Sequence, residues 1–418
     1  MSDFIIDNNY SCYRRSGANY MQALAPVGLI PLSGSVEFTD KVNANLVARR
    51  QQYITGNALA AHNEYGLIRQ DYRIPAQTVR FSSGEAKGVI KSTVRGHDLY
   101  ILCDITNYSV TYKLFGHEVP LGPDDYYQDL KRIILATCGR ARRINVIMPY
   151  LYESRQDIRN SRESLDCAFM LQELFDLGVA SILTFDPHEP RVENSVPCKG
   201  IEIIPSTYQL IAGFLTNCPD VSFDGEHRLM VISPDENGMK RAMYYASVLE
   251  VPLGTFFRQR DYSHLVDGRN PVMSHNYMGE NVAGRDILMV SDMMETGNSF
   301  IETARQLKEQ DARNIYMVST FGIFAHGLDA LDQAYADGVF NKVIITNLSY
   351  ITPELASRPW LVSVDMTEFV ALIIDALNHD VSIAALLDQT SQIKSLLKLK
   401  GEPKKFQEWV EERNGQNG

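Results

Sequence analysis

Cysteine is scarce in this chain of 418 residues, which carries six and places no two of them in a Cys-x-x-Cys pair. Such spacing excludes a zinc-finger module, and six thiols in a chain of this length are too few for a disulfide scaffold. The first residues contain neither a basic cluster nor the long apolar stretch of a secretory signal. We therefore expect a cytoplasmic protein with reduced thiols.

Basic residues and long apolar runs are scarce as well. The 40 Lys and Arg residues are outnumbered by 51 Asp and Glu residues, which gives a formal net charge of -11. An acidic chain lacks the positive field with which proteins grip nucleic acids or anionic membranes non-specifically. The longest apolar stretches, such as residues 369–374, fall well short of the ~18 residues needed to span a bilayer. We therefore expect no nucleic-acid partner and no membrane partner.

What the chain has instead is an alternation of short, β-rich apolar runs with helical patterns. Strands are predicted over residues 99–103, 144–148, 181–185, 229–232, 287–290, 315–318 and 343–346. Helices are predicted over residues 124–136, 164–177 and 300–310. Strands that alternate with helices of ten to fifteen residues are typical of parallel α/β domains. The predicted fold class is therefore α/β, with mostly parallel sheets flanked by helices.

The alternation runs twice along the chain, over roughly residues 85–205 and 225–370, which suits two similar α/β domains. We expect an N-terminal extension at 1–30, domains at 31–205 and 206–370, and a C-terminal helix and tail at 371–418. From residue 389 onward, five lysines precede three glutamates. That charge pattern predicts a solvated helix with a frayed end.

The most informative segment runs from residue 287 to 299, where a predicted strand leads through acidic and small residues into a helix. Asp292 and Glu295 lie at the end of the strand, and Thr-Gly-Asn-Ser follows as residues 296–299. Small residues allow backbone N–H groups to converge on a phosphate, and the helix N-terminus adds partial positive charge. Carboxylates beside them suit sugar hydroxyls. An ordinary strand–helix loop whose Ser and Thr cap the helix explains the same residues.

This segment resembles the 5-phosphoribosyl-1-pyrophosphate (PRPP) signature of type I phosphoribosyltransferases and PRPP synthetases, which is Asp-Asp-Met-Ile-Asp-Thr-Gly-Gly-Thr in the synthetases. Four other stretches resemble synthetase motifs in the expected order: Phe81-Ser-Ser-Gly-Glu85, Pro149-Tyr-Leu-Tyr-Glu-Ser-Arg-Gln-Asp157, Leu183-Thr-Phe-Asp-Pro-His188 and Val231-Ile-Ser-Pro-Asp235. Over roughly residues 75–385 the chain thus resembles a divergent ribose-phosphate pyrophosphokinase, that is, a PRPP synthetase. Ordinary phosphoribosyltransferases have a single such domain.

The resemblance implies a fold, a reaction and partners. The two domains would be of the phosphoribosyltransferase type, with the active site between them. The reaction would transfer the diphosphoryl group of ATP to ribose 5-phosphate, giving PRPP and AMP, with Mg²⁺ as the cofactor. Members of this family associate, so a homo-oligomer built from dimers, up to a hexamer, is also implied.

The resemblance also implies residue roles. Arg258 and Arg260 would belong to the catalytic loop, and the metal would be held by His188 and Asp235. ATP would be bound by Phe81, Ser83, Glu85, Arg155, Gln156 and His188. Ribose 5-phosphate would be bound by Ser291, Asp292, Glu295, Thr296, Gly297, Asn298 and Ser299.

Three of these residues have simple structural interpretations too. Arg155 stands close to Arg159 and Arg162 and could belong to a basic helix start. A lone histidine such as His188 is often structural, and Phe81 could be a buried core aromatic.

Departures from the family pattern bear on activity. Arg258 stands in place of a catalytic lysine; arginine keeps the positive charge but differs in reach and geometry. In the sugar loop Ser291 and Glu295 each stand in place of an aspartate. Further departures are Asn298 for Gly, Ser83 for Asp and a long loop at residues 261–276.

Three functions are compatible with these departures. The first is an active, diverged synthetase. The second is a catalytically impaired paralogue that assembles with a true synthetase and regulates it. The third, a phosphoribosyltransferase that consumes PRPP, leaves the N-terminal half unexplained.

Overall fold

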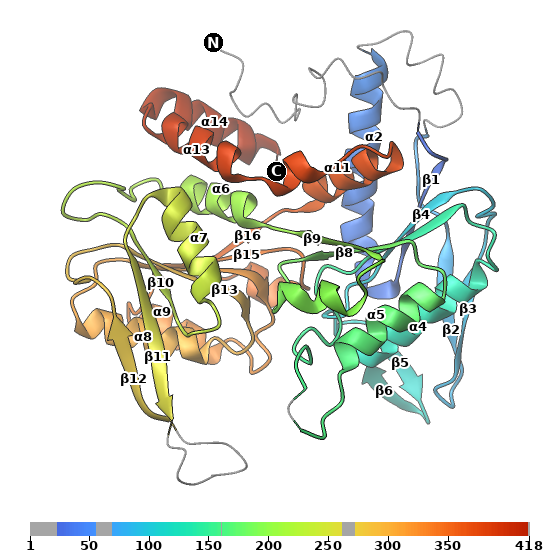
Figure 1. Cartoon of the computed structure of the whole chain (residues 1–418), viewed down its shortest axis with the longest axis horizontal. Helices are drawn as coiled ribbons and strands as arrows, with labels where there is room; N and C mark the ends of the chain where they lie inside the picture. Colours follow the sequence, from blue (N-terminus) through green and yellow to red (C-terminus); the bar gives the residue numbers. More distant parts are fainter. Residues whose placement is uncertain (1–22, 56–68, 160, 261–271, 417–418) are drawn as a thin grey trace.

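The computed structural model of this chain describes residues 23–55, 69–159, 161–260 and 272–416. Its two α/β domains lie side by side, the N-terminal one mainly blue and green and the C-terminal one mainly yellow and orange (Figure 1). Each domain has a central, mostly parallel sheet flanked by helices. The predicted fold class is confirmed.

The N-terminal sheet has five parallel strands in the order β1-β4-β7-β8-β9. Alternate residues of these strands face two separate cores, one under α4 and α5 and the other under α2. The strands are buried on both faces for this reason, which is why they are continuous apolar runs in the sequence. The elements are β1 (Val27–Pro31), β4 (Asp98–Leu102), β7 (Arg143–Ile147), β8 (Ser181–Phe185), β9 (Gly200–Ile204), α2 (Val36–Thr55), α4 (Pro123–Ala136) and α5 (Asp166–Asp176).

The C-terminal sheet has seven strands in the order β12-β11-β10-β13-β14-β15-β16, and β12 alone runs antiparallel to its neighbour. Helices α6 and α7 pack on one face, and α8, α9 and α10 pack on the other. The strands are β10 (Met230–Ser233), β11 (Leu253–Arg260), β12 (Val272–Met278), β13 (Ile287–Met294), β14 (Ile315–Gly322), β15 (Lys342–Thr346) and β16 (Leu361–Val364). The helices are α6 (Thr207–Asn217), α7 (Met239–Leu249), α8 (Asn298–Glu309), α9 (Asp329–Ala336) and α10 (Pro353–Ala356).

All seven predicted strands are present, and the three predicted helices correspond to α4, α5 and α8. Two strands extend beyond the apolar runs that predicted them, to Met294 in β13 and Gly322 in β14. Polar residues carry this extension, because Ser291 of β13 pairs in register with Ser319 of β14. Two small hairpins complete the N-terminal domain: β2 (Ala76–Arg80) with β3 (Ala86–Ile90), and β5 (Thr111–Leu114) with β6 (His117–Pro120).

Helix α11 (Thr367–Asn378) follows the last strand of the C-terminal sheet but packs on α2 of the N-terminal domain (Figure 1). Asn45 of α2 donates a hydrogen bond to Thr367, and Arg50 of α2 forms an ion pair with Asp375. The apolar side chains of α11 join a core cluster that includes residues of both sheets. The chain therefore crosses back, and one continuous core holds the two domains together.

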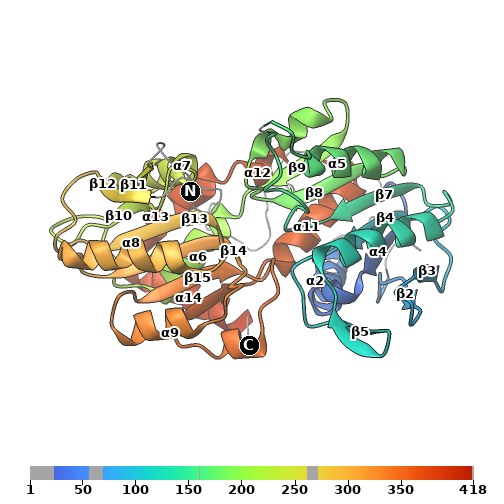
Figure 2. The same cartoon turned by 90° about the horizontal axis from the view of Figure 1, so that it is seen from below.

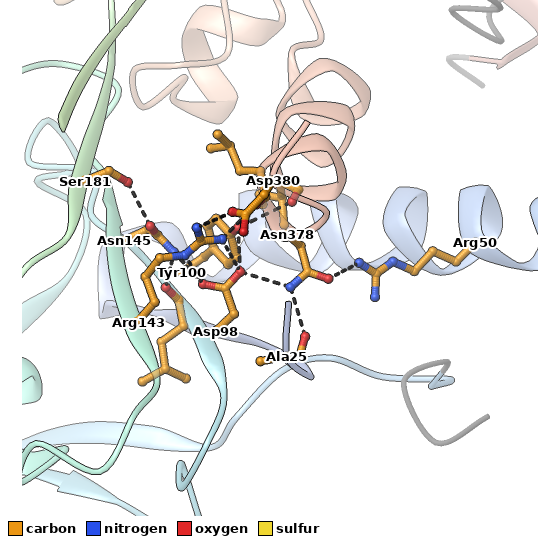
Figure 3. Close-up of polar contacts among 12 residues, drawn as sticks. Ala25, Arg50, Asp98, Tyr100, Arg143, Asn145, Ser181, Asn378 and Asp380 are labelled. Atoms are coloured by element: carbon orange, nitrogen blue, oxygen red, sulfur yellow. Dashed lines mark hydrogen bonds and ion pairs between the residues drawn. The ribbon is translucent and has the colours of Figure 1, made fainter. Parts of the chain in front are cut away.

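A buried polar network fixes the end of α11 to the start of two N-terminal strands (Figure 3). Asp98 is fully buried and accepts hydrogen bonds from Arg143 Nε at 2.7 Å and Nη2 at 2.8 Å. Asn378 of α11 donates to the same carboxylate at 3.0 Å, and Arg143 also donates to the carbonyl of Leu377. This network lies at the amino ends of β4 and β7, away from the strand ends that carry the motifs.

The C-terminal sheet repeats this pairing. Asp286, fully buried before β13, accepts hydrogen bonds from Arg313, which precedes β14. In both domains a glycine with positive φ stands two residues before the aspartate: Gly96 at 71° and Gly284 at 73°. The shared Gly-x-Asp turn and its arginine partner indicate that the two domains are built on one plan.

The C-terminal tail differs from the prediction of a solvated helix. Helices α13 (Thr390–Lys400) and α14 (Pro403–Gln416) follow a short α12 (Ala384–Leu387), and α13 packs on α6 and α7. Ile393, Leu396, Phe406, Trp409 and Val410 are buried in the main core. Their helical spacing was hidden among charged residues that lie on the solvent side. None of the helices in the described part of the chain has both the length and the apolar character of a membrane span.

Candidate functional site

The carboxyl ends of the two sheets meet at an interface that we call the seam. Tyr150, after β7, packs edge-on against Phe321 of β14, with 5.1 Å between ring centroids. Thr106, after β4, accepts the backbone N–H of Tyr350, which follows β15. Every predicted motif except the hairpin turn at Phe81 follows a strand that belongs to one of these sheets, and ligands of open α/β sheets bind at such ends. Figure 2 shows the N-terminal and C-terminal domains meeting at the seam.

His188 and Asp292, each a predicted site residue, form the first pair across the seam. His188 Nδ1 lies 2.8 Å from Asp292 Oδ2, while Ser291 donates its hydroxyl to Asp292 Oδ1 at 3.1 Å. The hydrogen bond with Asp292 raises the pKa of His188, although burial opposes the change. Burial raises the pKa of Asp292, but the His188 bond and the charge of Arg241 outweigh it and the net shift is downward. Asp292 is therefore an anion at neutral pH.

Arg155 and Glu295 form the second pair across the seam. Arg155 Nη1 lies 2.8 Å from Glu295 Oε1, and the two side chains are 53% and 48% exposed. The hydrogen bond that Arg155 donates to Glu295 raises the pKa of the Arg155 guanidinium. A residue predicted to bind ATP therefore contacts one predicted to bind the sugar, and both are open to solvent.

Asp186 lies at the centre of the seam and was not among the predicted site residues. It accepts hydrogen bonds from the N–H and hydroxyl of Ser206, and from the hydroxyl of Thr320 at 2.8 Å. Arg241 of α7 adds an ion pair at 2.6 Å. Four donors saturate the carboxylate, so Asp186 fixes the backbone two residues before His188. Its φ of 37° is strained for a non-glycine residue, and such strain is often found at functional sites.

The segment between β13 and α8 has the features of an anion pocket. Gly297 has a φ of 80°, and α8 begins at the next residue. In the described structure the backbone N–H groups of Thr296, Gly297 and Ser299 have no hydrogen-bond partner, whereas that of Asn298 bonds to the hydroxyl of Thr296. Free N–H groups at the start of a twelve-residue helix suit a phosphate.

Asp235, the other predicted metal ligand, lies in the turn that precedes α7. Its Oδ1 accepts the N–H of Gly238 at 3.0 Å, and its carbonyl accepts the hydroxyl of Ser233. The described residues include no group of three or more His, Cys, Asp and Glu side chains that could hold a metal ion. The Asp235 carboxylate is an oxygen donor of the kind that Mg²⁺ prefers, and Mg²⁺ usually takes its other ligands from water and phosphate.

The structure does not bring the Phe81 turn to the seam. Phe81, Ser83 and Glu85 lie in the loop of the β2–β3 hairpin, where Ser83 donates to Glu85 at 3.3 Å. Both views place this hairpin at the outer side of the N-terminal domain (Figures 1 and 2). Phe81 is 49% exposed, so it is not the core aromatic of the structural alternative. Gln156 is exposed beside Arg155.

The predicted catalytic arginines lie at the end of β11. Arg258 pairs in register with His275 of β12, and a register irregularity follows at Arg260; their side chains lie outside the described residues. The predicted loop over 261–276 is described only from residue 272, where it already forms β12 rather than a loop.

Comparisons with known proteins match both domains. Residues 32–178 match the family model of the N-terminal domain of ribose phosphate pyrophosphokinase, and residues 198–356 match the phosphoribosyl transferase domain. A putative ribose-phosphate pyrophosphokinase 2 of Streptococcus mutans is 30% identical over 285 residues, or 67% of this chain and 77% of that protein. The ribose-phosphate pyrophosphokinase of Vibrio parahaemolyticus is 26% identical over 75% of this chain and 91% of its own length.

The fold has a counterpart among solved structures. The crystal structure of phosphoribosylpyrophosphate synthetase from Mycobacterium smegmatis superposes with a TM-score of 0.64 at 19% identity, covering 85% of this chain and 99% of that one. At that identity the likeness concerns the fold alone.

Proposed function

Because the chain belongs to the ribose-phosphate pyrophosphokinase family, we propose that it transfers the diphosphoryl group of ATP to ribose 5-phosphate. The 1-hydroxyl oxygen of the sugar bonds to the β-phosphorus of ATP while the bond from that phosphorus to the α–β bridging oxygen breaks. AMP leaves with the bridging oxygen, the hydroxyl proton passes to solvent, and PRPP is the second product.

The observation that carries this proposal is the pairing across the seam. Arg155 and His188, from the motifs that resemble an ATP site, each lie 2.8 Å from a carboxylate of the segment that resembles a sugar-phosphate site. Two reactants held by these two segments would be adjacent, and adjacency with correct orientation is a large part of phosphoryl-transfer catalysis.

The predicted site residues would share the tasks of this reaction. Arg155 offers a planar fork to phosphate oxygens, and the free N–H groups of Thr296, Gly297 and Ser299 would receive the 5-phosphate. Asp292 and Ser291 hydrogen-bond sugar hydroxyls. His188 and Asp235 would hold Mg²⁺, which neutralises the phosphate charges when bound. Arg258 and Arg260 would stabilise the charge that develops on the transferred group.

We further propose a homo-oligomer built from dimers, up to a hexamer. The exposed Phe81 turn supports this proposal, because it lies away from the seam of its own chain. Phe115, 76% exposed at the tip of the neighbouring hairpin, donates its N–H to Ser82 of the same turn. Both aromatics are exposed on these two hairpins, where a second subunit would cover them, and ATP would then contact Phe81, Ser83 and Glu85 of a neighbour.

A second candidate is a catalytically impaired paralogue that regulates a true synthetase. Ser291 favours it: where the family pattern has a carboxylate, this chain has a buried hydroxyl that is engaged with Asp292. A serine holds a sugar hydroxyl more weakly than a carboxylate does.

The test is AMP and PRPP release by the purified protein from Mg²⁺–ATP, with and without ribose 5-phosphate. AMP and PRPP in equal amounts, formed only with the sugar, support the synthetase. The Asp292→Asn variant is the control, because it keeps the shape of the side chain and removes its charge. No turnover together with tight binding to an active synthetase subunit would favour the paralogue instead.

A further inference from the structure

The His188–Asp292 and Arg155–Glu295 pairs each join an ATP-side residue to a sugar-side carboxylate, but they differ in how firmly they are held. Asp292 is 13% exposed and has further contacts with Ser291 and the charge of Arg241. Arg155 and Glu295 are each about half exposed, and no other ion pair is present for either side chain in the described structure. The second pair is therefore the one that a charged ligand can open easily.

We propose that Glu295 is an internal ligand of Arg155, which competes with the triphosphate of ATP for that guanidinium and thereby couples the two substrate sites. This inference rests on the proposed function, because it names how the same site receives its substrates. Competition for Arg155 is a second role for Glu295, in addition to the binding of ribose 5-phosphate that its place in the sugar loop implies.

The competition follows from the chemistry of the guanidinium. Glu295 holds the Nη1 donor of Arg155, so a phosphate that binds through Nη1 has to displace it, and a phosphate oxygen pair matches the guanidinium as well as a carboxylate does. With Glu295 bound, the cation is neutralised before ATP arrives. An exposed pair of this kind contributes little free energy, so ATP displaces it at a small loss of affinity.

The length of the side chain makes this contact specific to the present chain. The family pattern has an aspartate where this chain has Glu295. Aspartate is shorter by one methylene, about 1.5 Å of reach. Since the observed contact is 2.8 Å, a carboxylate drawn back by that amount would lie beyond hydrogen-bond distance without movement of the backbone.

Coupling between the substrates is the consequence. When the triphosphate takes Arg155, the Glu295 carboxylate is released beside the sugar pocket, where it can accept a hydroxyl. When the sugar engages Glu295 first, Arg155 is released for ATP. Linkage requires the two effects to be equal, so each substrate should tighten the binding of the other.

The experiment measures binding without turnover. The probe is α,β-methylene-ATP with Mg²⁺, which cannot be cleaved at the bond that breaks, titrated by calorimetry with and without ribose 5-phosphate. The variants are Glu295→Gln, which removes the charge, and Glu295→Asp, which keeps the charge but shortens the side chain. The matched control is Glu402→Gln, which breaks a surface ion pair between Glu402 and Lys405 of α14. The side chains of both residues are 58% exposed.

Both Glu295 variants should bind the analogue roughly two- to fivefold more tightly than the wild type in the absence of sugar, as expected for loss of an exposed competing pair. Ribose 5-phosphate should tighten analogue binding in the wild type and do so less in Glu295→Gln. Glu402→Gln should match the wild type. Unchanged analogue affinity in both Glu295 variants would overturn the inference.

The outcomes separate this inference from the proposed function. Tighter analogue binding in the Glu295 variants of a chain that releases no PRPP would support the competition and reject the synthetase. Normal turnover, together with unchanged analogue affinities in the Glu295 variants, would support the synthetase and reject the competition. A wild-type chain that does not bind the analogue at all would overturn both.

Discussion

Asp186 and Arg241 form a largely buried ion pair between the two domains, with 2.6 Å between Asp186 Oδ1 and Arg241 Nη1. The aspartate follows β8 by one residue, and the arginine lies in the first turn of α7, shortly after Asp235. The pair therefore ties the strand end that carries His188 to the helix whose start carries Asp235. The two predicted metal ligands come from different domains, and the ion pair between their neighbours links the segments that carry them.

Arg241→Met should destabilise the protein by about 3 kcal/mol or more, because it leaves the Asp186 carboxylate buried without its cation. Urea unfolding followed by tryptophan fluorescence measures the loss. Arg305→Met is the control, since it removes an ion pair with Asp337 that is 48% and 39% exposed and should change stability by less than about 1 kcal/mol. Equal losses in the two variants would contradict the role given to Asp186.

The contribution of Asp104 to the stability of the protein should depend on pH. Asp104 accepts the N–H and hydroxyl of Thr106, whose oxygen accepts the N–H of Tyr350 from the other domain. Burial raises the pKa of Asp104 to about 6, and the Thr106 bonds offset this only in part. Because the folded pKa lies above the unfolded one, the group's contribution to stability is full below the unfolded pKa of 3.8 and is lost as the pH rises through about 6.

Asp104→Asn removes this titration. The difference in free energy of unfolding between the variant and the wild type should therefore change in favour of the variant as the pH rises from about 4 to 7, by at most about 3 kcal/mol. Urea unfolding at a series of pH values measures it. A difference that stays constant over that range would show that Asp104 titrates normally.

Ser291→Asp, which restores the family residue, should impair this chain rather than improve it. The serine is 8% exposed and donates to Asp292, so an aspartate there removes a donor and sets two carboxylates side by side. Like charges raise one pKa of such a pair. We expect the acid limb of the pH–rate profile to move up by about one unit and the KM for ribose 5-phosphate to rise.

Ser291→Asn is the companion variant, because it adds similar bulk without charge and should leave the acid limb in place. A lower KM for the sugar in Ser291→Asp would instead mean that the backbone adapts to the second carboxylate. The serine of the wild type would then only weaken sugar binding.

Local patterns predicted the sheets and the segments that reach the seam. The apolar runs gave seven strands because both sheets are buried on both faces, and Arg155, His188, Asp292 and Glu295 were placed by motifs that follow those strands. In a parallel sheet the carboxyl ends share one edge, so the motifs within each domain come together whenever the fold of that domain is right.

Pairings between distant segments were not predictable in this way. Nothing in the sequence around Asp186 indicates that Arg241 is its partner, and nothing near Asp98 points to Asn378. The repeated Gly-x-Asp turns at the starts of β4 and β13 were a usable signal. Each aspartate has an arginine partner at the start of the strand that neighbours its own in the sheet. The crossing of α11 depends on the summed burial of an apolar helix, which no single residue reveals.

Gly297→Ala should weaken the binding of ribose 5-phosphate roughly tenfold while the fold is kept. Gly297 has a φ of 80°, which costs a side chain about 1–2 kcal/mol, and an added Cβ would lie 3.3 Å from Leu331. The positive φ and the Leu331 contact together strain the turn, and relief of that strain by the backbone moves the N–H groups of Thr296 and Ser299 from their places at the start of α8. Gly338→Ala is the matched control: its φ is 70°, yet nothing lies within 4 Å of the added Cβ. Both variants should lose similar stability in urea, but only Gly297→Ala should lose affinity in a calorimetric titration with ribose 5-phosphate. If the two variants bound the sugar phosphate equally well, the pocket at residues 296–299 would not be its site.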